Sequence, residues 1–290
     1  MHLQTHNLSP LRYPGGKAKL TNYIIDLMKL NNLQGCTYIE PFAGGAGAAL
    51  ALLFNEIVGN IIINDYDRAI YSFWYSVLNH TEELCDLIFM TPVTMDEWYK
   101  QKEIFSSSDD LLELGFATFF LNRTNRSGII KGGVIGGMEQ KGKYKLNCRF
   151  TKSDLMKRIK TIALYKDQIT LTCMDACNFI TDYLPHVSKY ALVYLDPPYY
   201  TKGPGLYTNF YKDKDHRELA RLIRKTLRQP WIVTYDNVEE ISQLYSGYYQ
   251  TKYSLNYSVN NKYKGQEILI CGDNLIPVVS PNLRRLEACY

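Results

Sequence analysis

The tetrapeptide Asp196-Pro197-Pro198-Tyr199 is the strongest chemical signal in the sequence, and it directly follows an apolar segment, ALVYL. Two prolines can simply end a strand. Ligands of open α/β sheets, however, bind beyond the carboxyl ends of the strands, which is where this tetrapeptide would lie. Its position therefore favours a chemical role over a purely structural one.

The residue types in this motif suit a substrate amine that is conjugated to a ring. Such a nitrogen is a poor nucleophile because its lone pair is delocalised. The Asp196 carboxylate and the Pro197 carbonyl could accept both amino hydrogens and favour a pyramidal, reactive nitrogen. The prolines would hold these acceptors rigidly before reaction, and the Tyr199 ring would stack on the substrate.

A second signal is the glycine-rich loop over residues 42–47, FAGGAG. Its small residues let a ligand approach the backbone closely. Asp65 lies 21 residues after Gly44, at the end of the next predicted strand, the usual place for an acid that binds a ribose diol. Together these features predict an adenosine-containing ligand. A nicotinamide cofactor is not favoured, because FAGGAG departs from GxGxxG and no hydride-transfer site is evident.

The elements around these motifs predict a doubly wound α/β domain. The basic segment 11–20 is expected to run into a helix that ends at about Leu30. Further helices are expected over 48–54, 154–165, 215–228 and 237–245, and strands over 37–40, 61–63, 169–172, 191–195, 231–235, 248–255 and 267–271. Residues 81–122 have helical periodicity, whereas 123–150 contain six glycines and no sustained periodicity. The chain is thus predicted to be one α/β sheet interrupted by a helical insertion over about 80–165.

Positive charge is concentrated in that insertion. Between Arg123 and Lys160 there are eleven lysines or arginines but only two acids, so the segment carries +9 while the whole chain carries +4. A solvated surface can carry such a cluster. Its combination with a loop rich in glycine, asparagine and arginine favours a polyanionic partner.

The composition is typical of a folded protein. Of the 290 residues 46% are hydrophobic and 21% charged. No apolar run approaches the roughly 18–20 residues that cross a bilayer, so no membrane association is expected. The first residues lack the order of a secretory signal. The seven cysteines form neither a CxxC pair nor a zinc pattern, so we expect reduced thiols, a cytoplasmic location and no metal site.

Five segments resemble the Dam-like, class D12 DNA adenine methyltransferases: RYPGGK (12–17), EPFAGGAG (40–47), NDYD (64–67), LNRTNRSG (121–128) and DPPYY (196–200). Their order is that of the α group of amino-methyltransferases, with the target-recognition region between the glycine motif and DPPY. The resemblance implies a Rossmann-like methyltransferase sheet, mostly parallel with a C-terminal antiparallel hairpin. Residues 1–80 and 166–290 would form the catalytic domain, and 81–165 a helical, basic target-recognition domain.

The resemblance also implies a site for S-adenosylmethionine, with S-adenosylhomocysteine as product. Lys17 would face the methionine carboxylate, Asp65 would accept the ribose hydroxyls and Asp175 would lie near the adenine. Lys17 could instead be a solvated surface residue, and Asp175 could cap a helix. The positions implied to contact the cofactor are Tyr13, Lys17, Phe42, Ala43, Gly44, Gly45, Asp65, Asp175 and Asp196.

In the DPPY motif, the resemblance implies that Asp196 and Pro197 bind the amino group of a flipped adenine while Tyr199 stacks on it. The recognition region departs from the best-known members, which often carry an aromatic residue and Asn-Gly where this chain has Arg126-Ser127-Gly128. The GATC target of those members is therefore not assumed. The candidates for DNA contacts are Arg123, Asn125, Arg126 and Lys131, with loop solvation as the alternative.

The sequence therefore predicts a bacterial or phage DNA methyltransferase that modifies the 6-amino group of adenine in double-stranded DNA. Three alternatives remain: methylation of the cytosine 4-amino group, methylation of guanine in RNA, and a silent DNA-binding relic of the fold. A restriction endonuclease that reads the same site is a candidate partner. A monomer is expected, with a dimer as the alternative.

Overall fold

The computed structural model describes residues 8–12, 20–201, 211–257 and 263–278. These residues form a seven-stranded sheet in the order β3-β2-β1-β4-β5-β7-β6. The strands are β1 (Thr37–Glu40), β2 (Asn60–Asn64), β3 (Ile169–Thr172), β4 (Ala191–Leu195), β5 (Trp231–Asp236), β6 (Tyr249–Tyr257) and β7 (Tyr263–Cys271). The first five are parallel, whereas β7 runs antiparallel to both β5 and β6. The predicted fold is confirmed, including its C-terminal antiparallel hairpin.

The strand order brings the two chemical motifs together. The chain moves outward from β1 to β2 and β3, and then returns so that β4 pairs with β1, with Thr37 opposite Ala191. Ligands of open α/β sheets bind at such a reversal, beyond the carboxyl ends of the two strands on either side of it, which here are β1 and β4. The glycine loop follows β1 and the DPPY motif follows β4, so both segments lie at the same end of two neighbouring strands although about 150 residues separate them in sequence.

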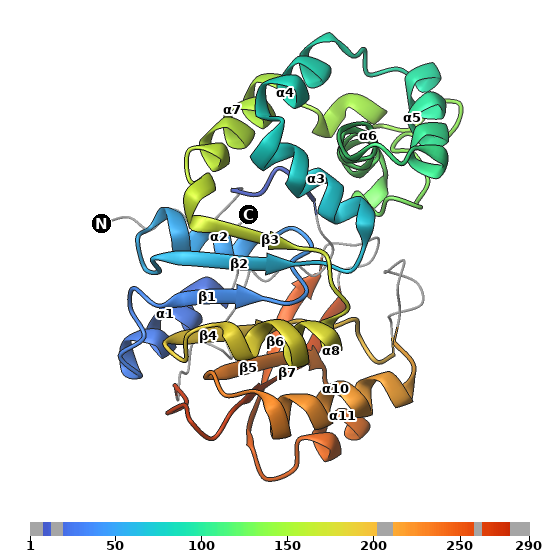
Figure 1. Ribbon diagram of the computed structural model, residues 1–290. Helices are drawn as coiled ribbons and strands as arrows, with labels where there is room; N and C mark the ends of the chain where they lie inside the picture. The colour runs from blue at the N-terminus through green and yellow to red at the C-terminus, as the bar shows by residue number, and fades with distance from the viewer. Residues whose placement is uncertain (1–7, 13–19, 202–210, 258–262, 279–290) are drawn as a thin grey trace.

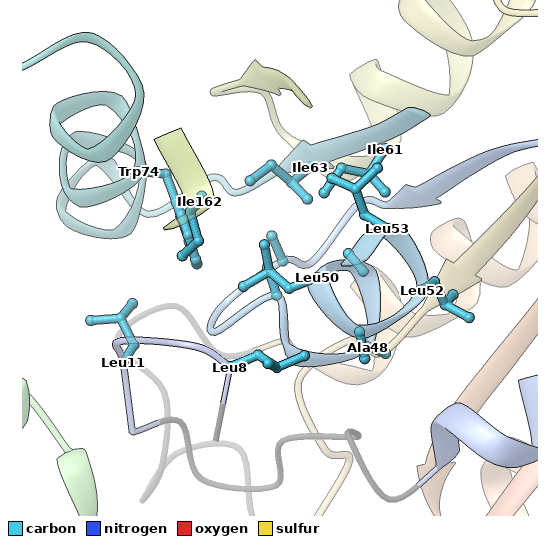
Figure 2. Packing of buried hydrophobic residues seen from close by; sticks show 14 of the residues in the cluster. Leu8, Leu11, Ala48, Leu50, Leu52, Leu53, Ile61, Ile63, Trp74 and Ile162 are labelled. Atoms are coloured by element: carbon cyan, nitrogen blue, oxygen red, sulfur yellow. The ribbon is translucent and has the colours of Figure 1, made fainter. Parts of the chain in front are cut away.

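Apolar residues alternate along the central strands and supply a core on each face of the sheet. On β4, Leu192 and Tyr194 join one cluster, whereas Val193 and Leu195 join the other. Figure 2 shows the first cluster, in which the helix α2 (Gly47–Phe54) packs over β2. The helix α1 (Thr21–Leu30) contributes to the same cluster. The opposite face is covered by the short helices within 176–186, by α10 (Asp213–Thr226) and by α11 (Glu239–Leu244).

A group of helices lies beside the edge strand β3 (Figure 1). It consists of α3 (Arg68–Asn79), α4 (Thr81–Met90), α5 (Met95–Ser107), α6 (Leu111–Thr124) and α7 (Lys152–Ala163). Between α6 and α7 the chain is irregular, with short 3-10 turns over Arg126–Gly128 and Leu146–Arg149. The helix α3 packs on α6 although it precedes the predicted boundary at residue 81. The division into two domains therefore stays a proposal.

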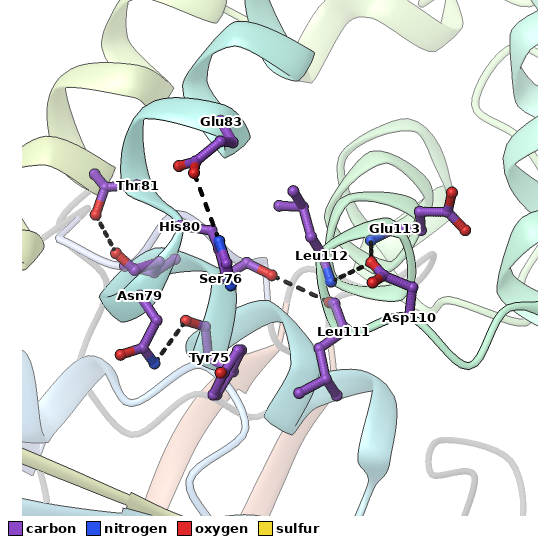
Figure 3. Close-up of polar contacts among 11 residues, drawn as sticks. Tyr75, Ser76, Asn79, His80, Thr81, Glu83, Asp110, Leu111, Leu112 and Glu113 are labelled. Atoms are coloured by element: carbon purple, nitrogen blue, oxygen red, sulfur yellow. Dashed lines mark hydrogen bonds and ion pairs between the residues drawn. The ribbon is translucent and has the colours of Figure 1, made fainter.

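The contact between α3 and α6 is unusually close at Gly115, because a Cβ there would lie 2.4 Å from the Ser76 Oγ. The rings of Phe73 and Phe119 stack across the same contact at 5.8 Å. Figure 3 shows the polar groups at its end, where Ser76 Oγ donates to the carbonyl of Leu111 at 3.1 Å. The Asp110 carboxylate caps α6 there. These contacts hold α3 and α6 closely together.

Candidate active site

The glycine loop is held in place by hydrogen bonds from β2 and α3. The Ala43 amide donates to the Asn64 carbonyl at 2.9 Å, and the Gly44 amide donates to Asp65 Oδ2 at 2.8 Å. On the other side of the loop, Trp74 Nε1 donates to the Gly44 carbonyl at 2.9 Å. Ala43, Gly44 and Gly45 are buried and Phe42 is half-buried. The loop is therefore pre-formed, and its small side chains are the kind that let a ligand approach the backbone closely.

Asn64 ties together the loops that follow three adjacent strands. Its Nδ2 donates to the carbonyls of Pro41 and Met174, each at 3.0 Å. Its Oδ1 accepts from Thr172 Oγ1 at 2.8 Å and from the Met174 amide at 2.9 Å. Sequence reasoning gave Asn64 no role, although a polar residue directly after the apolar run from Ile61 to Ile63 can indicate a structural hydrogen bond. Its buried amide keeps the ends of β1, β2 and β3 in register.

Asp65 occupies the position predicted for a ribose-binding acid. Besides Gly44, its carboxylate accepts from the Asp67 amide at 2.9 Å, which fixes the side-chain rotamer. Burial raises the pKa of Asp65 to about 7, and the two amide donors partly offset that increase. Each carboxylate oxygen has a second lone pair for a hydroxyl donor. Asp65 and the small-residue loop therefore fit an adenosine-containing ligand.

An acidic residue ends or follows β1, β2, β3 and β4, which are four of the five parallel strands. These residues are Glu40, Asp65, Asp175 and Asp196. Glu40 is buried and accepts from the Ala49 amide at 3.1 Å, and its pKa is raised to about 8 mainly by burial and further by the negative charge of Asp196. A positively charged ligand at this edge would favour the ionised forms of Glu40 and Asp65, as the sulfonium and amino groups of S-adenosylmethionine would.

Asp175 acts as a helix cap in the structure. Its side chain accepts from the amides of Cys177 at 2.9 Å and Asn178 at 3.3 Å, where the short helix α8 (Ala176–Asn178) begins. This is the structural alternative that the sequence left open. The predicted contact between Asp175 and the cofactor adenine stays a prediction.

The DPPY motif emerges from β4 with its carboxylate oriented by a neighbouring strand. The half-buried Asp196 accepts at Oδ1 from Thr234 Oγ1 of β5 at 2.7 Å. The Thr234 hydroxyl lies 2.9 Å from the Tyr194 hydroxyl and, since its own proton points to Asp196, it accepts from Tyr194. Pro197 and Pro198 are buried. The acceptor pair is thus rigid before any substrate binds.

The residues after the motif are held by Asp236, the last residue of β5. Its carboxylate accepts from the amides of Tyr200 at 2.8 Å and Thr201 at 2.9 Å. Tyr199 is buried, and its hydroxyl donates to Glu267 on β7. Sequence reasoning missed Thr234, Asp236 and Glu267. The first two are polar residues within or at the end of the apolar strand β5, and Glu267 directly precedes the apolar run from Ile268 to Ile270.

The predicted DNA-contacting residues divide into two groups. Arg123 is buried, with Nε donating to the Arg149 carbonyl at 2.7 Å, and burial lowers its pKa to about 10. Asn125 is buried as well: its Oδ1 accepts from Trp98 Nε1 at 2.7 Å, and its Nδ2 donates to the Ile130 carbonyl at 2.7 Å. These bonds give both residues a role inside the irregular segment, and their DNA contacts stay a prediction.

Arg126 and Lys131, the other two candidates, are exposed. They lie on the irregular segment between α6 and α7, which also exposes the cations Lys141, Lys143, Lys145 and Arg149. Sequence position alone does not separate these exposed cations from the buried Arg123. The structure therefore makes Arg126 and Lys131 the stronger candidates for contacts with a ligand outside the fold.

Tyr13 and Lys17, which the sequence assigned to the cofactor, lie outside the described residues. The segment just before them is docked on the recognition region. The Arg12 amide donates to Asn122 Oδ1 at 2.7 Å, and Asn122 Nδ2 donates to the carbonyls of Arg12 and Gly128, each at 2.8 Å. The buried Asn122 amide thus joins the segments that contain RYPGGK and LNRTNRSG, 110 residues apart, and Arg12 Nη1 adds a hydrogen bond to the Asn125 carbonyl at 3.1 Å.

The described residues offer neither a metal site nor a membrane span. Within these ranges, no three His, Cys, Asp or Glu side chains are grouped so as to hold a metal ion. Among the helices of the described part of the chain, none is both long and apolar enough to span a membrane.

The sheet, the glycine loop and the DPPY motif define a Rossmann-like methyltransferase. The model of one family, described as D12 class N6 adenine-specific DNA methyltransferase, matches residues 13–260. The chain belongs to this family, and its reaction is the S-adenosylmethionine-dependent methylation of adenine in DNA. The predicted family, activity and cofactor are confirmed.

Two relatives have names consistent with this assignment. The Type II methyltransferase M.MjaIII of Methanocaldococcus jannaschii is 24% identical over 261 residues, which cover 82% of this chain and 88% of the relative. The Type II methyltransferase M.CviBI of Paramecium bursaria Chlorella virus NC1A is 26% identical over 232 residues, which cover 76% and 81%. Among solved structures, an S-adenosylmethionine-dependent methyltransferase of Agrobacterium tumefaciens is 10% identical with a TM-score of 0.41, and the match covers 89% of this chain and 63% of that one.

Replacing Asp65 by alanine is expected to weaken S-adenosylmethionine binding by roughly 1–3 kcal/mol, because the change removes the predicted ribose acceptor and the anchor of the Gly44 amide. Calorimetric titration measures the affinity. Asp67→Ala is the matched control, since it removes the cap of α3 at Ala69 but leaves the Asp65 carboxylate in place. Unchanged affinity in a folded Asp65→Ala variant would remove this residue from the cofactor site.

The pH dependence of binding provides a second measurement at Asp65. Because its pKa is raised to about 7, the carboxylate becomes fully ionised, and a better hydroxyl acceptor, only as the pH rises through that value. Wild-type affinity is therefore expected to increase from about pH 6 to about pH 8 relative to Asp65→Asn, which does not titrate in this range. Parallel pH profiles would contradict this assignment.

Proposed function

We propose that the chain methylates the 6-amino group of an adenine at a defined sequence of duplex DNA, after the base has been turned out of the helix. The observation that carries this proposal is the adjacency of the two loops after β1 and β4. One presents a pre-formed, small-residue cradle beside Asp65. The other presents a rigid pair of acceptors, the Asp196 carboxylate and the Pro197 carbonyl. A flat base between them would have its amino group next to the cofactor.

S-adenosylmethionine supplies an electrophilic methyl group when it is bound. The task of the protein is to make a delocalised amine nucleophilic. Asp196 and the Pro197 carbonyl each accept one amino hydrogen, which holds the nitrogen in a pyramidal geometry and directs its lone pair away from the ring. Thr234 keeps the Asp196 carboxylate in the required rotamer. Strong base catalysis is not needed, because the amine becomes acidic once it is alkylated and Asp196 is placed to receive the proton.

The segment 126–149 would contact the DNA. It exposes six cations, and Glu139 is its one acid. Lys141 forms an ion pair with Glu139 at 2.5 Å, so the positive charge of the other five is not offset by an acid within this segment. A cluster of one sign on an irregular segment suits the phosphate backbone. Residues 81–165 would accordingly act as the target-recognition unit.

The decisive experiment is the sequencing of DNA, with detection of modified bases, from methylation-free cells that express the chain. The proposal expects N6-methyladenine at one sequence motif, and unmodified DNA from cells that express Asp196→Ala. Modified cytosine in DNA would support the alternative that the chain methylates the cytosine 4-amino group. Modified guanine in RNA together with unmodified DNA would support an RNA methyltransferase, and no modification together with DNA binding in vitro would support a silent relic.

A restriction endonuclease that cuts the same sequence is the partner we propose, on the basis of the Type II methyltransferases to which the chain is similar. Once the methylated motif is known, DNA from expressing cells should resist endonucleases that recognise it. DNA from cells that express Asp196→Ala should be cut. A monomer is the proposed state in solution, and sedimentation equilibrium would distinguish it from a dimer.

Substitution of exposed cations is expected to separate recognition of the DNA sequence from binding to the phosphate backbone. Arg126→Ala or Lys131→Ala should relax the preference for one base at one position of the methylated sequence. For a true base contact, the discrimination against the wrong base should fall by about 1–3 kcal/mol. Lys143→Ala or Arg149→Ala should instead weaken all sequences alike and reduce the salt slope by about 1 for each phosphate that is no longer neutralised. Affinity against salt concentration and methylation of a mixed-sequence library measure the two effects. An unchanged motif in both loop variants would place recognition elsewhere.

A further inference from the structure

Glu267 joins the DPPY motif to the C-terminal hairpin through its buried carboxylate. The Tyr199 hydroxyl donates to Glu267 Oε1, and the hydroxyl of Tyr253, on β6, donates to Oε2. All three residues are almost completely buried, with exposed fractions of 4% for Tyr199, 2% for Tyr253 and 1% for Glu267. A carboxylate in such surroundings needs hydrogen-bond donors. Tyrosine hydroxyls supply them from both sides.

The position of Glu267 follows from the antiparallel pairing of β7 with β5. In that register Glu267 lies opposite Asp236, which binds the amides of Tyr200 and Thr201. Two neighbouring carboxylates therefore hold consecutive residues of the segment that follows the prolines. Asp236 holds the backbone, whereas Glu267 holds a side chain. A sixth parallel strand in the place of β7 would present its residues in a different register.

The hydrogen bond to Glu267 selects an orientation of the Tyr199 ring. The phenolic O–H bond prefers the plane of the ring, because the oxygen lone pair is conjugated with it. An acceptor at a fixed position therefore favours one rotation of the ring about its long axis. A phenylalanine in the same packing would lack this constraint. The bond thus controls the plane on which a base would stack.

We infer that Glu267 is a positioning residue for methyl transfer: it sets the plane of the Tyr199 ring, so that the stacked adenine directs its amino group toward Asp196 and the Pro197 carbonyl. This inference rests on the proposed function. It predicts that Glu267 acts through Tyr199 and not through the stability of the hairpin. A residue 68 positions beyond the motif in sequence would then determine how the base is presented.

The test is a set of substitutions, assayed by single-turnover methyl transfer. The substrate is an unmethylated duplex that contains the sequence motif at which the wild-type protein methylates DNA. Tyr199→Phe and Glu267→Leu should each slow transfer by about tenfold or more, since a small misplacement of reacting atoms is costly. Glu267→Gln should stay within about threefold of wild type, because its amide can accept from one tyrosine and donate to the other. Tyr253→Phe is the matched control, since it removes the hydrogen bond that does not reach the motif, and it should also stay within about threefold.

Two further readouts separate positioning from stability. Glu267→Leu in a Tyr199→Phe background should cause no additional loss, as expected when both changes remove one interaction. A duplex with 2-aminopurine at the target position should fluoresce differently with Glu267→Leu than with wild type, because quenching depends on stacking, while S-adenosylmethionine affinity stays unchanged. Additive losses, or an equal loss in Tyr253→Phe, would overturn the inference. If Glu267→Leu fails to fold, the comparison of Tyr199→Phe with Tyr253→Phe decides alone.

The wild-type assay keeps this inference distinct from the proposed function. If wild-type protein transfers no methyl group to adenine in the duplex, the proposed function fails. If wild-type protein is active and Tyr199→Phe is as fast as Tyr253→Phe, only the role of Glu267 fails.

Discussion

Asp196→Ala is expected to slow methyl transfer by about a hundredfold or more, the loss typical of removing one preorganised electrostatic contact. DNA and S-adenosylmethionine should still bind, because the carboxylate acts mainly on the reacting amine. The structure supports so large an effect, because the acceptor is rigid: Thr234 fixes its rotamer and the following prolines are buried. Single-turnover transfer and separate binding titrations measure the two quantities.

Thr234→Val provides the matched control for this prediction. It preserves the shape of the side chain but removes the donor to Asp196, so the carboxylate remains and loses only its orientation. We expect a rate of methyl transfer between that of wild type and that of Asp196→Ala. A variant Asp196→Ala that keeps more than about a tenth of wild-type turnover, equivalent to less than ~1.4 kcal/mol of barrier, would show that the assigned role is wrong.

The parts of the fold that were predictable from sequence are those in which local pattern and tertiary burial agree. The parallel strands are short runs of β-branched and other apolar residues, such as Ile61 to Ile63, and β1 ends just before Pro41 as predicted. The motifs after β1 and β4 could be located because each directly follows such a run. Position relative to a strand end is a local property, and the sheet then determines which loops meet.

The residues that brace the motif were not predictable in this way. Glu267 contacts Tyr199 across 68 residues, and this contact depends on the register of an antiparallel pair that periodicity does not encode. Thr234 and Asp236 alternate with apolar neighbours on β5, so a hydrophobic pattern registers them only as interruptions. Their role follows from the strand order, which brings β5 next to β4.

The irregular segment between α6 and α7 was difficult to predict for a different reason. Irregular segments are usually polar and solvated, so the sequence pattern does not reveal which of their polar residues are buried. Carbonyls in such a segment lack helix or strand partners, and buried ones need donors. Asn125 and Gln140 provide amides for this purpose, Gln140 Nε2 donating to the Ile135 and Gly137 carbonyls at 2.7 Å. Part of the polarity therefore stabilises the segment itself.

Gly128→Ala is expected to lower the free energy of unfolding by about 2–4 kcal/mol, although the change adds one methyl group. Gly128 has a φ of +76°, which disfavours any residue with a Cβ, and that Cβ would lie 2.0 Å from the Arg12 carbonyl oxygen. The backbone of one segment must therefore move. Gly133→Ala is the matched control in the same loop, since a Cβ there meets nothing within 4 Å. Urea unfolding measures both variants, and equal stabilities would contradict the prediction.

Gly128→Ala should also affect the binding of both S-adenosylmethionine and duplex DNA. The clash displaces the Arg12 carbonyl, which accepts from Asn122, and so loosens the docking of the N-terminal segment on the recognition loop. The residues next in the chain after Arg12 are those proposed to contact the cofactor, whereas the loop is proposed to contact DNA. We therefore expect weaker binding of S-adenosylmethionine and of duplex DNA in this variant, and neither effect in Gly133→Ala. Calorimetric titration of the cofactor and fluorescence anisotropy with a labelled duplex provide the measurements. A variant that binds DNA more weakly but keeps wild-type cofactor affinity would show that the two segments act independently.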